Sequence, residues 1–405
     1  MRDHTQERKT VALGSVATIK SGGTPDRKNP KYWLKGGIPW ATTSEVNYSV
    51  ICETKEQISE EGLRNSAAKI FPKGTLLIAL YGQGKTRGQV GILGMDAATN
   101  QACAAIQPNS EFDAKFMFYV LQNDYKRIRA LSNSGGQDNL SAELVREIRI
   151  PVASLPEQQK IAAILRTWDE ALEKLNALRA VKARWLEGLT QTTIGRGGVL
   201  PEHWQQKPLS EVCTPVKRKS TGGDHPVMTI SAKSGFLMQA DKFARDMAGR
   251  SVERYTLLHE GEFAYNKGNS KTAPYGCVFR LDRDTALVPF VYYCFSLKPG
   301  LDPEFYDHLF AVGALNHQLS RLINSGVRND GLLNLYSDDF FSCRVPVPPI
   351  EEQERIAQAL TTAKRELSLL DEEIAALADQ KRGLMQKLLT GEWRVEVSDD
   401  EEAAA

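Results

Sequence analysis

The sequence predicts an α+β protein in which two globular domains of mixed α/β structure alternate with two long helices. Three observations indicate this fold class: a segment beginning at Ile150 recurs at Val345, heptad-spaced apolar residues follow each copy, and short β-rich runs precede each copy. The chain of 405 residues has room for several domains at about 100–200 residues each. Its 41% apolar and 25% charged residues are typical of a globular protein and exclude disorder of the whole chain.

The internal repeat sets the domain organisation. IPVASLPEQQKIAAIL begins at Ile150 and VPVPPIEEQERIAQAL at Val345, an offset of 195 residues that later also aligns Gly188 with Gly383. This period is too long for a solenoid unit. We therefore expect two half-molecules, each a globular domain followed by a helix: a domain over 1–150, a helix and linker over 151–200, a second domain over 201–345 and a second helix over 346–395.

Each helix carries an apolar seam with alternating spacings of four and three residues, which is typical of a coiled coil. Lys381 alone interrupts the second seam, and the first becomes irregular through Leu178, Val181 and Trp185. The predicted seam residues are Ile161, Leu165, Trp168, Leu172 and Leu175 in the first helix, and Ile356, Leu360, Ala363, Leu367, Leu370, Ile374, Leu377, Leu384 and Leu388 in the second. We expect the two seams to pair within the chain; dimerisation of two chains through them is the alternative.

The domains share a frame but differ in content. Strands are expected at 75–80, 89–93 and 102–107 with a helix at 114–131, and at 226–230, 262–266, 275–279 and 289–297 with a helix at 303–323. Both domains begin with similar residues (13–16 and 209–212) and end with Asn-Leu (139–140 and 334–335). Two domains with similar ends and different sequences between them suit two modules that recognise different targets.

Charge and cysteine use narrow the class of protein. No apolar run reaches the roughly 20 residues of a membrane span, and the polar start MRDHTQERKT lacks a signal core. The six cysteines include no C-x-x-C, so we expect reduced thiols in a cytoplasmic protein. Residues 346–405 hold 14 acidic and 7 basic side chains, including an acidic tail at 396–405 that we expect to be disordered. The remaining body is moderately basic, which permits a nucleic-acid partner.

One segment imitates a phosphate-binding loop. Residues 79–86 follow a predicted strand and end in Gly84, Lys85 and Thr86, but Ala79 replaces the required glycine. The following RGQVG favours a turn into another strand rather than a helix. We therefore expect a basic loop that contacts phosphates or bases. An ATP-using enzyme is the alternative. An ATP-binding assay on the Lys85→Ala variant distinguishes the two hypotheses.

Catalytic motifs are not found. The sequence has no methyltransferase Asn/Asp-Pro-Pro-aromatic signature, no strand followed by G-x-G-x-x-G, and no ligand spacing among its six histidines. Nothing catalytic is duplicated with the frame, so the prediction is a binding protein without catalytic or metal-binding residues. A coiled-coil scaffold that does not bind DNA is a further alternative, against which salt-dependent duplex binding would argue.

Glycine-rich, basic loops supply the candidate binding residues. Asn, Gln, Arg and Lys side chains suit base edges, and Ser and Thr suit phosphates. The candidates are Lys20, Ser21, Thr24, Thr42, Thr43, Ser44, Gln83, Lys85, Thr86, Arg87, Gln137 and Asn139 in the first domain, and Lys217, Arg218, Lys219, Lys233, Asn266, Lys267, Asn269, Lys271, Arg328 and Asn329 in the second.

Taken together, these motifs resemble the specificity (S) subunit of a type I restriction–modification enzyme. The resemblance covers about residues 10–395 and rests on SGGTP at 21–25, Asn29-Pro30, Tyr32-Trp33, GIPW at 37–40, the two joints at 150–161 and 345–356, and GLMQKLLTG at 383–391. The second domain departs from the pattern, because KSTGG at 219–223 stands where SGGTP would be expected.

The resemblance implies two target-recognition domains, each reading one half of a bipartite DNA sequence through the major groove. It also implies that the helices form an antiparallel coiled coil that sets the spacer between the half-sites. Two methyltransferase subunits would dock on the helical regions and methylate adenine with S-adenosylmethionine. Restriction/translocase subunits would use ATP and Mg²⁺ to cut DNA, while the specificity subunit itself catalyses nothing and binds no cofactor.

Overall fold

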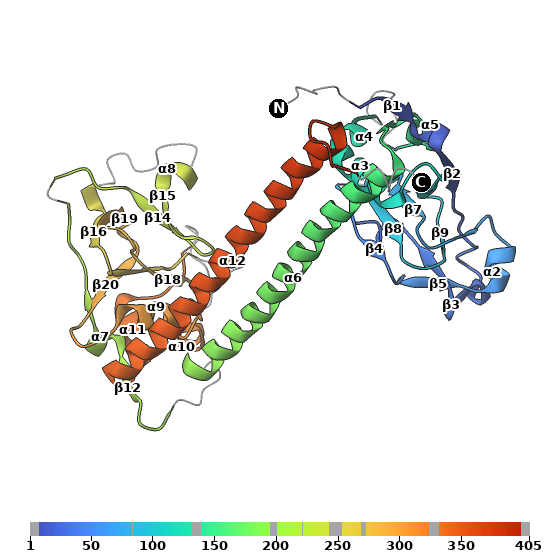
Figure 1. Cartoon of the computed structure of the whole chain (residues 1–405). Coiled ribbons are helices and arrows are strands. Elements are labelled where there is room, and N and C mark those ends of the chain that lie inside the picture. The colour runs from blue at the N-terminus through green and yellow to red at the C-terminus, as the bar shows by residue number, and fades with distance from the viewer. Residues whose placement is uncertain are drawn as a thin grey trace. The chain divides into compact units, whose positions relative to one another are not determined.

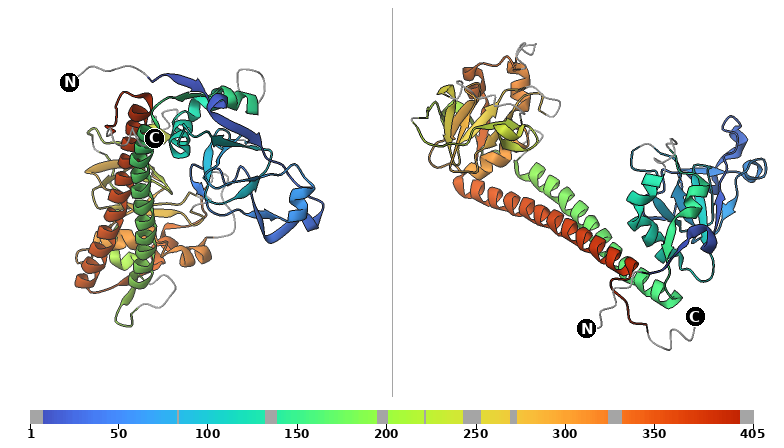
Figure 2. Two further views of the ribbon diagram at one scale, coloured as in Figure 1. Left: turned by 45° about the vertical axis from the view of Figure 1, so that its right-hand side comes forward. Right: turned by 90° about the horizontal axis from the view of Figure 1, so that it is seen from above.

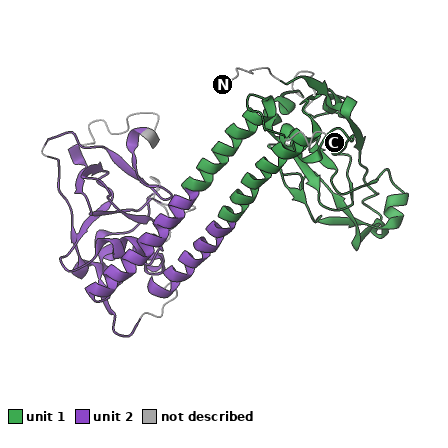
Figure 3. Ribbon diagram, in the orientation of Figure 1, with its two compact units in different colours: residues 1–176, 372–405 green, residues 177–371 purple. Residues whose placement is uncertain are grey.

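The computed structural model describes residues 8–82, 84–131, 139–194, 201–220, 222–242, 253–268, 273–323 and 332–397. It divides into two compact units (Figure 3): unit 1 comprises Met1–Asn176 and Glu372–Ala405, and unit 2 comprises Ala177–Asp371. The sequence-based boundaries separated domains from helices, whereas each compact unit contains one globular domain and part of both long helices. None of the helices within the described ranges combines the length and apolar character needed to cross a membrane.

Figure 1 labels the elements along the chain. The first domain and its helix comprise β1 (Thr10–Ala12), α1 (Leu13–Val16), β2 (Ala17–Ser21), the 3-10 helix η1 (Pro30–Tyr32), β3 (Trp33–Ala41), β4 (Val50–Ile51), β5 (Glu56–Ile58), α2 (Glu60–Arg64), β6 (Ile70–Phe71), β7 (Leu76–Ala79), β8 (Val90–Leu93), β9 (Ala97–Thr99), β10 (Cys103–Pro108), α3 (Ala114–Asn123), α4 (Tyr125–Leu131), α5 (Ala142–Glu147), β11 (Arg149–Pro151) and α6 (Leu155–Ile194). The second comprises β12 (Gln205–Pro208), α7 (Leu209–Val212), β13 (Cys213–Pro215), β14 (Met228–Ser231), β15 (Gly235–Met238), α8 (Gln239–Lys242), β16 (Thr256–His259), β17 (Phe263–Asn266), β18 (Cys277–Arg280), β19 (Thr285–Val288), β20 (Tyr293–Leu297), α9 (Pro303–Ala311), α10 (Asn316–Leu322), α11 (Ser337–Ser342), β21 (Arg344–Val347) and α12 (Ile350–Thr390).

Each of the two domains contains a central antiparallel sheet, and the strand order is the same in both. Its strand order is β2-β10-β7-β8 in unit 1, where β4 extends it, and β13-β20-β17-β18 in unit 2. Unit 1 adds a second sheet of order β5-β3-β9-β6, whereas unit 2 adds the pairs β14-β15 and β16-β19. The repeated order confirms the shared frame, and the added strands account for the divergent sequence between its ends.

Most predicted elements are found, but the two amphipathic helices are each broken. The expected helix at 114–131 is interrupted at Asp124, and the one at 303–323 is interrupted between α9 and α10. The second break contains Gly313 at φ +73°, a left-handed conformation that glycine adopts readily. Apolar periodicity persists through these breaks because both segments face the same core, so periodicity alone misses them.

In each unit, the parts of both long helices that belong to it pack on its globular domain. In unit 1, Ile161 and Leu165 of α6 join Met385 and Leu388 of α12 in the core beneath α3. The start of α6 and the end of α12 lie side by side in Figure 1 and in both views of Figure 2. In unit 2, Ile356 and Leu360 of α12 join the core that contains the end of α6.

Ion pairs connect the two helices within each unit. Lys381 of α12 binds Asp169 of α6 in unit 1, and in unit 2 Arg179 and Lys182 of α6 bind Asp371 and Glu366 of α12. In unit 2 the partner numbers fall along α12 as they rise along α6, so the two segments run antiparallel there.

The seam of the first helix, which was expected to become irregular after Leu175, keeps its spacing when charged residues are included. The four-three spacing continues through Arg179, Lys182 and Leu186, while Leu178, Val181 and Trp185 are exposed. Lys381, the interruption in the second seam, is buried against Asp169. The seam positions were hidden because charged side chains occupy them.

Candidate nucleic-acid interface

Strand register brings the predicted loops of unit 1 to one edge of the central sheet. Ala104 of β10 pairs with Ser21 at the end of β2, and Cys103 pairs with Ala79 at the end of β7. The loops that follow β2 and β7 therefore lie beside the loop that precedes β10.

Two more segments join this edge. The amide of Asn100 donates to the carbonyl of Ala41 (3.1 Å), which places residues 42–44 beside the start of β10. The amide of Leu140 donates to the carbonyl of Leu80 (3.0 Å), which brings Asn139 to the β7–β8 loop. The structure thus gathers residues from four loops that the sequence only suggested as separate candidates.

Unit 2 repeats the arrangement at the equivalent edge. The amide of Val216 donates to Cys294 (2.8 Å), so residues 217–219 leave β13 where residues 22–24 leave β2. The amide of Leu333 donates to Lys267 (2.9 Å), as Leu140 does to Leu80 in unit 1. Asn266 Nδ2 donates to the carbonyl of Ile230 (3.2 Å), which adds the β14–β15 turn with Lys233.

The exposure of the candidates falls into three groups, and their contacts with DNA remain predictions. The exposed residues are Lys20, Ser21, Ser44, Lys85, Asn139, Lys217, Arg218, Lys219 and Lys233, and the half-buried ones are Thr24, Thr42, Thr43, Thr86 and Asn266. Arg87 and Lys267 are buried. Gln83, Gln137, Asn269, Lys271, Arg328 and Asn329 lie outside the described residues.

Two of the candidate cations, Lys267 and Arg87, are buried and differ in their contacts. Lys267 Nζ donates to the hydroxyl of Tyr293 (3.3 Å) and lies 5.0 Å from the centre of its ring. Arg87 is 9% exposed, and its Nε has no acceptor in the described part of the chain. The contacts of Lys267 favour a structural contribution over direct contact with a ligand.

The β7–β8 loop is held by hydrogen bonds at both of its ends. The amide of Gly88 donates to Ala79 (2.9 Å), the hydroxyl of Tyr125 donates to the carbonyl of Lys85 (2.7 Å), and β8 begins at Val90. A phosphate-binding loop requires a helix directly after the Lys-Thr pair. The strand that follows Thr86 contradicts that alternative and leaves the Lys85 side chain exposed at the interface.

The SGGTP stretch acts as a close-packed support. A Cβ on Gly22 would lie 2.0 Å from the carbonyl oxygen of Thr99, and one on Gly23 would lie 2.3 Å from the backbone of Ala67. Trp40 Nε1 donates to the carbonyl of Gly23 (2.9 Å). These glycines are needed because two backbone segments approach the loop, which fixes the loop beside β9.

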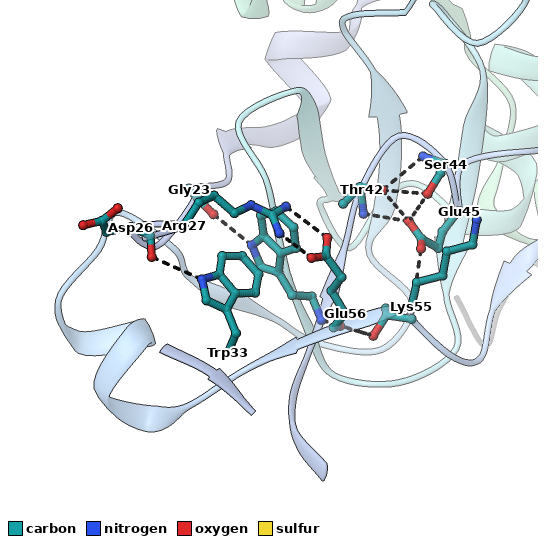
Figure 4. A network of polar contacts seen from close by, with 11 residues as sticks. Gly23, Asp26, Arg27, Trp33, Thr42, Ser44, Glu45, Lys55 and Glu56 are labelled. Atoms are coloured by element: carbon teal, nitrogen blue, oxygen red, sulfur yellow. Dashed lines mark hydrogen bonds and ion pairs between the residues drawn. The ribbon is translucent and has the colours of Figure 1, made fainter. Parts of the chain in front are cut away.

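Arg27 continues this loop and was not identified from the sequence. Its guanidinium lies 4.0 Å from the ring centre of Trp33 and 4.8 Å from that of Trp40, and it makes two hydrogen bonds to Glu56 (Figure 4). Trp33 Nε1 donates to the carbonyl of Asp26 (3.2 Å). The WxxxxxxW spacing on β3 does not predict this stack, since it forms across a bulge in the strand.

Glu45 organises the loop at 42–44, as Figure 4 shows. Its carboxylate accepts hydrogen bonds from the hydroxyls of Thr42 (2.7 Å) and Ser44 (3.0 Å). Burial alone would raise the pKa of Glu45. These hydrogen bonds and those from the backbone lower it by more than burial raises it, so the pKa of Glu45 lies below the ordinary value. The amide of Ser44 also donates to the hydroxyl of Thr42 (3.2 Å), so these bonds fix the conformation of the loop.

A duplicated glutamine, to which the sequence assigned no role, connects each domain to its helix. Gln158 Oε1 accepts from the amide of Asp113 (2.9 Å), the N-cap of α3, and Gln353 Oε1 accepts from the amide of Asp302 (2.9 Å), the N-cap of α9. Both side chains are fully buried. The exact repeat of Glu-Gln in the two joints was the signal that could have revealed this pair.

A second connection differs between the units. In unit 1 the hydroxyl of Tyr119 donates to Asp169 (2.7 Å), which also binds Lys381. In unit 2 His308 lies at the equivalent place, where Lys364 donates to its Nδ1 (2.8 Å). Burial, and then the charge of Lys364, lower the pKa of His308 to about 4. No cluster of His, Cys, Asp and Glu that could hold a metal occurs among the described residues.

Sequence comparisons identify similar proteins along nearly the whole chain. Residues 6–183 match the family described as type I restriction modification DNA specificity domain. The specificity subunit of the type I restriction enzyme MjaIX from Methanocaldococcus jannaschii is 23% identical, over 95% of this chain and 93% of the relative. The EcoKI specificity subunit from Escherichia coli K12 is 20% identical, over 97% and 92%.

Solved structures show the same fold. The S subunit of a type I restriction–modification system from M. genitalium superposes with a TM-score of 0.58 at 15% identity, over 98% of this chain and 99% of the other. The HsdS subunit from Thermoanaerobacter tengcongensis gives a TM-score of 0.51 at 17% identity, over 96% and 98%.

Proposed function

We propose that this chain is the non-catalytic subunit that selects the DNA sequence in a type I restriction–modification system, a proposal supported by its similarity to specificity subunits of that kind. The observation that carries the proposal is the duplicated sheet edge, which gathers polar and basic loop residues at equivalent places in two domains. Different residues occupy the two edges, so each domain would read a different half-site, and the target would be bipartite.

We further propose that α6 and α12 form an antiparallel coiled coil that sets the spacer between the half-sites. Their lengths of 40 and 41 residues correspond to about 60 Å of helix each. That length exceeds one turn of duplex, about 34–36 Å. The ion pairs between the helices and the buried glutamines that fix each domain to its helix support such a spacer.

The partners follow from the proposed role. Double-stranded DNA would bind the two edges, and two methyltransferase subunits would dock on the helical regions and use S-adenosylmethionine. Restriction/translocase subunits with ATP and Mg²⁺ would complete the assembly. The chain itself would hold no cofactor, and its loops would contribute affinity through phosphates and selectivity through bases.

Matched insertions in the two helices test the spacer. Three heptads inserted after Leu175 and after Ile374 lengthen each helix by about 31 Å, close to one duplex turn. Selection of bound duplexes from a random library by the full chain, together with its methyltransferase partner, should recover the same half-sites with a spacer longer by about 9–10 base pairs.

A one-heptad insertion at the same positions is the control. It adds about 10 Å, or about three base pairs, which would turn the second half-site by roughly 100° around the duplex. We expect this variant to lose bipartite recognition at every spacer. An unchanged spacer after the three-heptad insertion would contradict the ruler, and selection of no preferred sequence by the unaltered chain would contradict DNA recognition itself.

A further inference from the structure

The apolar seams of the two long helices are nearly interchangeable. Ile161, Leu165, Leu172 and Leu175 of α6 correspond, at the 195-residue offset, to Ile, Leu, Leu and Leu of α12. Such a seam could be buried as well by α6 of a second copy as by α12. Apolar packing therefore does not decide which helix pairs with which.

The charged contacts are not interchangeable. Three ion pairs join α6 to α12 in the described part of the chain, and each falls within one compact unit. Lys381 binds Asp169 with its side chain only 9% exposed. Lys182 Nζ lies 2.7 Å from Glu366 Oε2, and Arg179 Nη2 lies 3.1 Å from Asp371 Oδ2.

The repeat offset shows what each charge would meet if like helices paired. In an α6–α6 pair of the same register, Asp371 is replaced by its counterpart Asn176, Glu366 by Ala171 and Lys381 by Leu186. Asp169 and Arg179 would then lose their opposite charges, whereas Lys182 would exchange Glu366 for Glu173 of the second copy.

An α12–α12 pair is less favourable still. Asp371 would face Ile374 in place of Arg179, and Glu366 would face Leu377 in place of Lys182. Lys381 would face Lys364, a like charge. A buried cation that loses its carboxylate and meets another cation is strongly disfavoured.

We propose that these six residues form a pairing code that directs α6 to α12 and rejects the equivalent helix of a second copy. The code residues are Asp169, Arg179 and Lys182 on α6, and Glu366, Asp371 and Lys381 on α12. Polar residues at seam positions specify partner and register at some cost in stability, which the apolar seam offsets. Between α12 of the same chain and α12 of another copy, the high effective concentration within one chain favours the former.

Cysteine reporters at uncharged positions distinguish the pairings in the full chain. The register of the ion pairs places Ala183 opposite Leu367, so Ala183→Cys with Leu367→Cys reports the α6–α12 pair. The same register places Leu172 opposite Ala183 of a second copy, so Leu172→Cys with Ala183→Cys reports an α6–α6 pair and cannot close within one helix. Cys52 and Cys277, which have accessible surface, are first replaced by serine.

Each reporter is refolded from denaturant at several chain concentrations, oxidised mildly and analysed by non-reducing electrophoresis. With the native code, we expect the α6–α12 reporter to close within the chain and the α6–α6 reporter to give only background dimer. With all six code residues changed to leucine, we expect the α6–α6 dimer to rise about ten-fold or more, the factor that 1.4 kcal/mol of preference represents.

Two outcomes overturn the proposal: covalent α6–α6 dimer with the native code, or no rise in that dimer with the leucine code. The α6–α12 reporter in the leucine background shows whether that variant still folds. If it does not, the exchange variant Asp169→Lys, Arg179→Asp, Lys182→Glu, Glu366→Lys, Asp371→Arg and Lys381→Asp decides. It restores all three pairs with reversed polarity, although it removes the Tyr119–Asp169 hydrogen bond. Its α6–α6 dimer must stay at the background of the native chain, whereas reversal of the α6 residues alone must raise that dimer.

Discussion

The duplicated glutamines allow one perturbation to be made twice in the same molecule. Gln158→Leu keeps the side-chain volume but removes the acceptor for the amide of Asp113 and the donor to the carbonyls of Glu111 and Ala153. Glu111 is exposed, so its carbonyl can bind water instead. The amide of Asp113 and the carbonyl of Ala153 lose their partner, at a cost of about 1–3 kcal/mol each. Gln353→Leu strands the amide of Asp302 and the carbonyl of Pro348 in the same way.

We therefore expect each substitution to lower the free energy of local opening by about 2–6 kcal/mol. Hydrogen exchange measured by mass spectrometry reads the two units separately, which a single unfolding curve does not. Exchange in α3 should speed up by about 30-fold or more in Gln158→Leu while α9 is unchanged, and the reverse should hold for Gln353→Leu.

Gln191 and Gln386 provide the matched control. They repeat at the same offset but are exposed, so Gln→Leu at either position should change local stability by no more than about 0.5 kcal/mol. Faster exchange in both α3 and α9 from one joint substitution, or equal effects from the control pair, would refute the view that each glutamine holds its own domain to its own helix.

Four further predictions follow from single positions. Lys85→Ala should weaken duplex binding about equally across sequences and reduce the salt slope by about one, whereas Arg87→Ala should first lower thermal stability because its side chain is buried; similar binding profiles at unchanged stability would contradict this. Gly22→Ala should destabilise unit 1 by about 3 kcal/mol or more, since its Cβ meets a backbone carbonyl, and soluble protein with native exchange would disprove the contact. Gly188→Ala should instead stabilise α6 by about 1 kcal/mol in urea unfolding, because nothing lies within 4 Å of the added Cβ. The pKa of His308 is lowered to about 4, so the unfolded chain protonates this histidine before the folded chain does as the pH falls below about 6.5. The free energy of unfolding should therefore drop by about 2 kcal/mol between pH 7 and pH 4, after allowance for solvent screening. The His308→Gln variant should lose that part of the pH dependence of the urea midpoint.

The repeat and the heptads were enough to predict the elements of this chain. Periodicity located both long helices and most strands of the central sheets, although β2 and β13 were not expected, and the seam from Ile356 to Leu388 stays a prediction. It failed where a tertiary partner replaces local preference. Arg179 and Lys182 occupy seam positions because carboxylates on α12 face them, and no one-helix pattern contains that information.

The candidate site also combines features that the sequence predicts with features that only the fold decides. Residue type alone identified Lys85, Asn139 and the other loop residues, since polar and glycine-rich loops stand out in any sequence. Their convergence depends on sheet order and register, which pair strands distant in the chain. Arg27 and Glu45 were missed because their significance comes from two indole rings and two hydroxyls that only folding brings within contact.

By itself, then, the amino-acid order determined that two halves share one frame, that each ends in a long helix, and that their loops are suited to polar ligands. Only the tertiary structure decided which loops form one edge, which cations are buried beneath them, and which glutamines hold each domain in place. The physical reason is that periodicity and composition are local properties, whereas burial and hydrogen-bond partners depend on residues far away in the chain, such as Asp169 and Lys381, which are 212 positions apart.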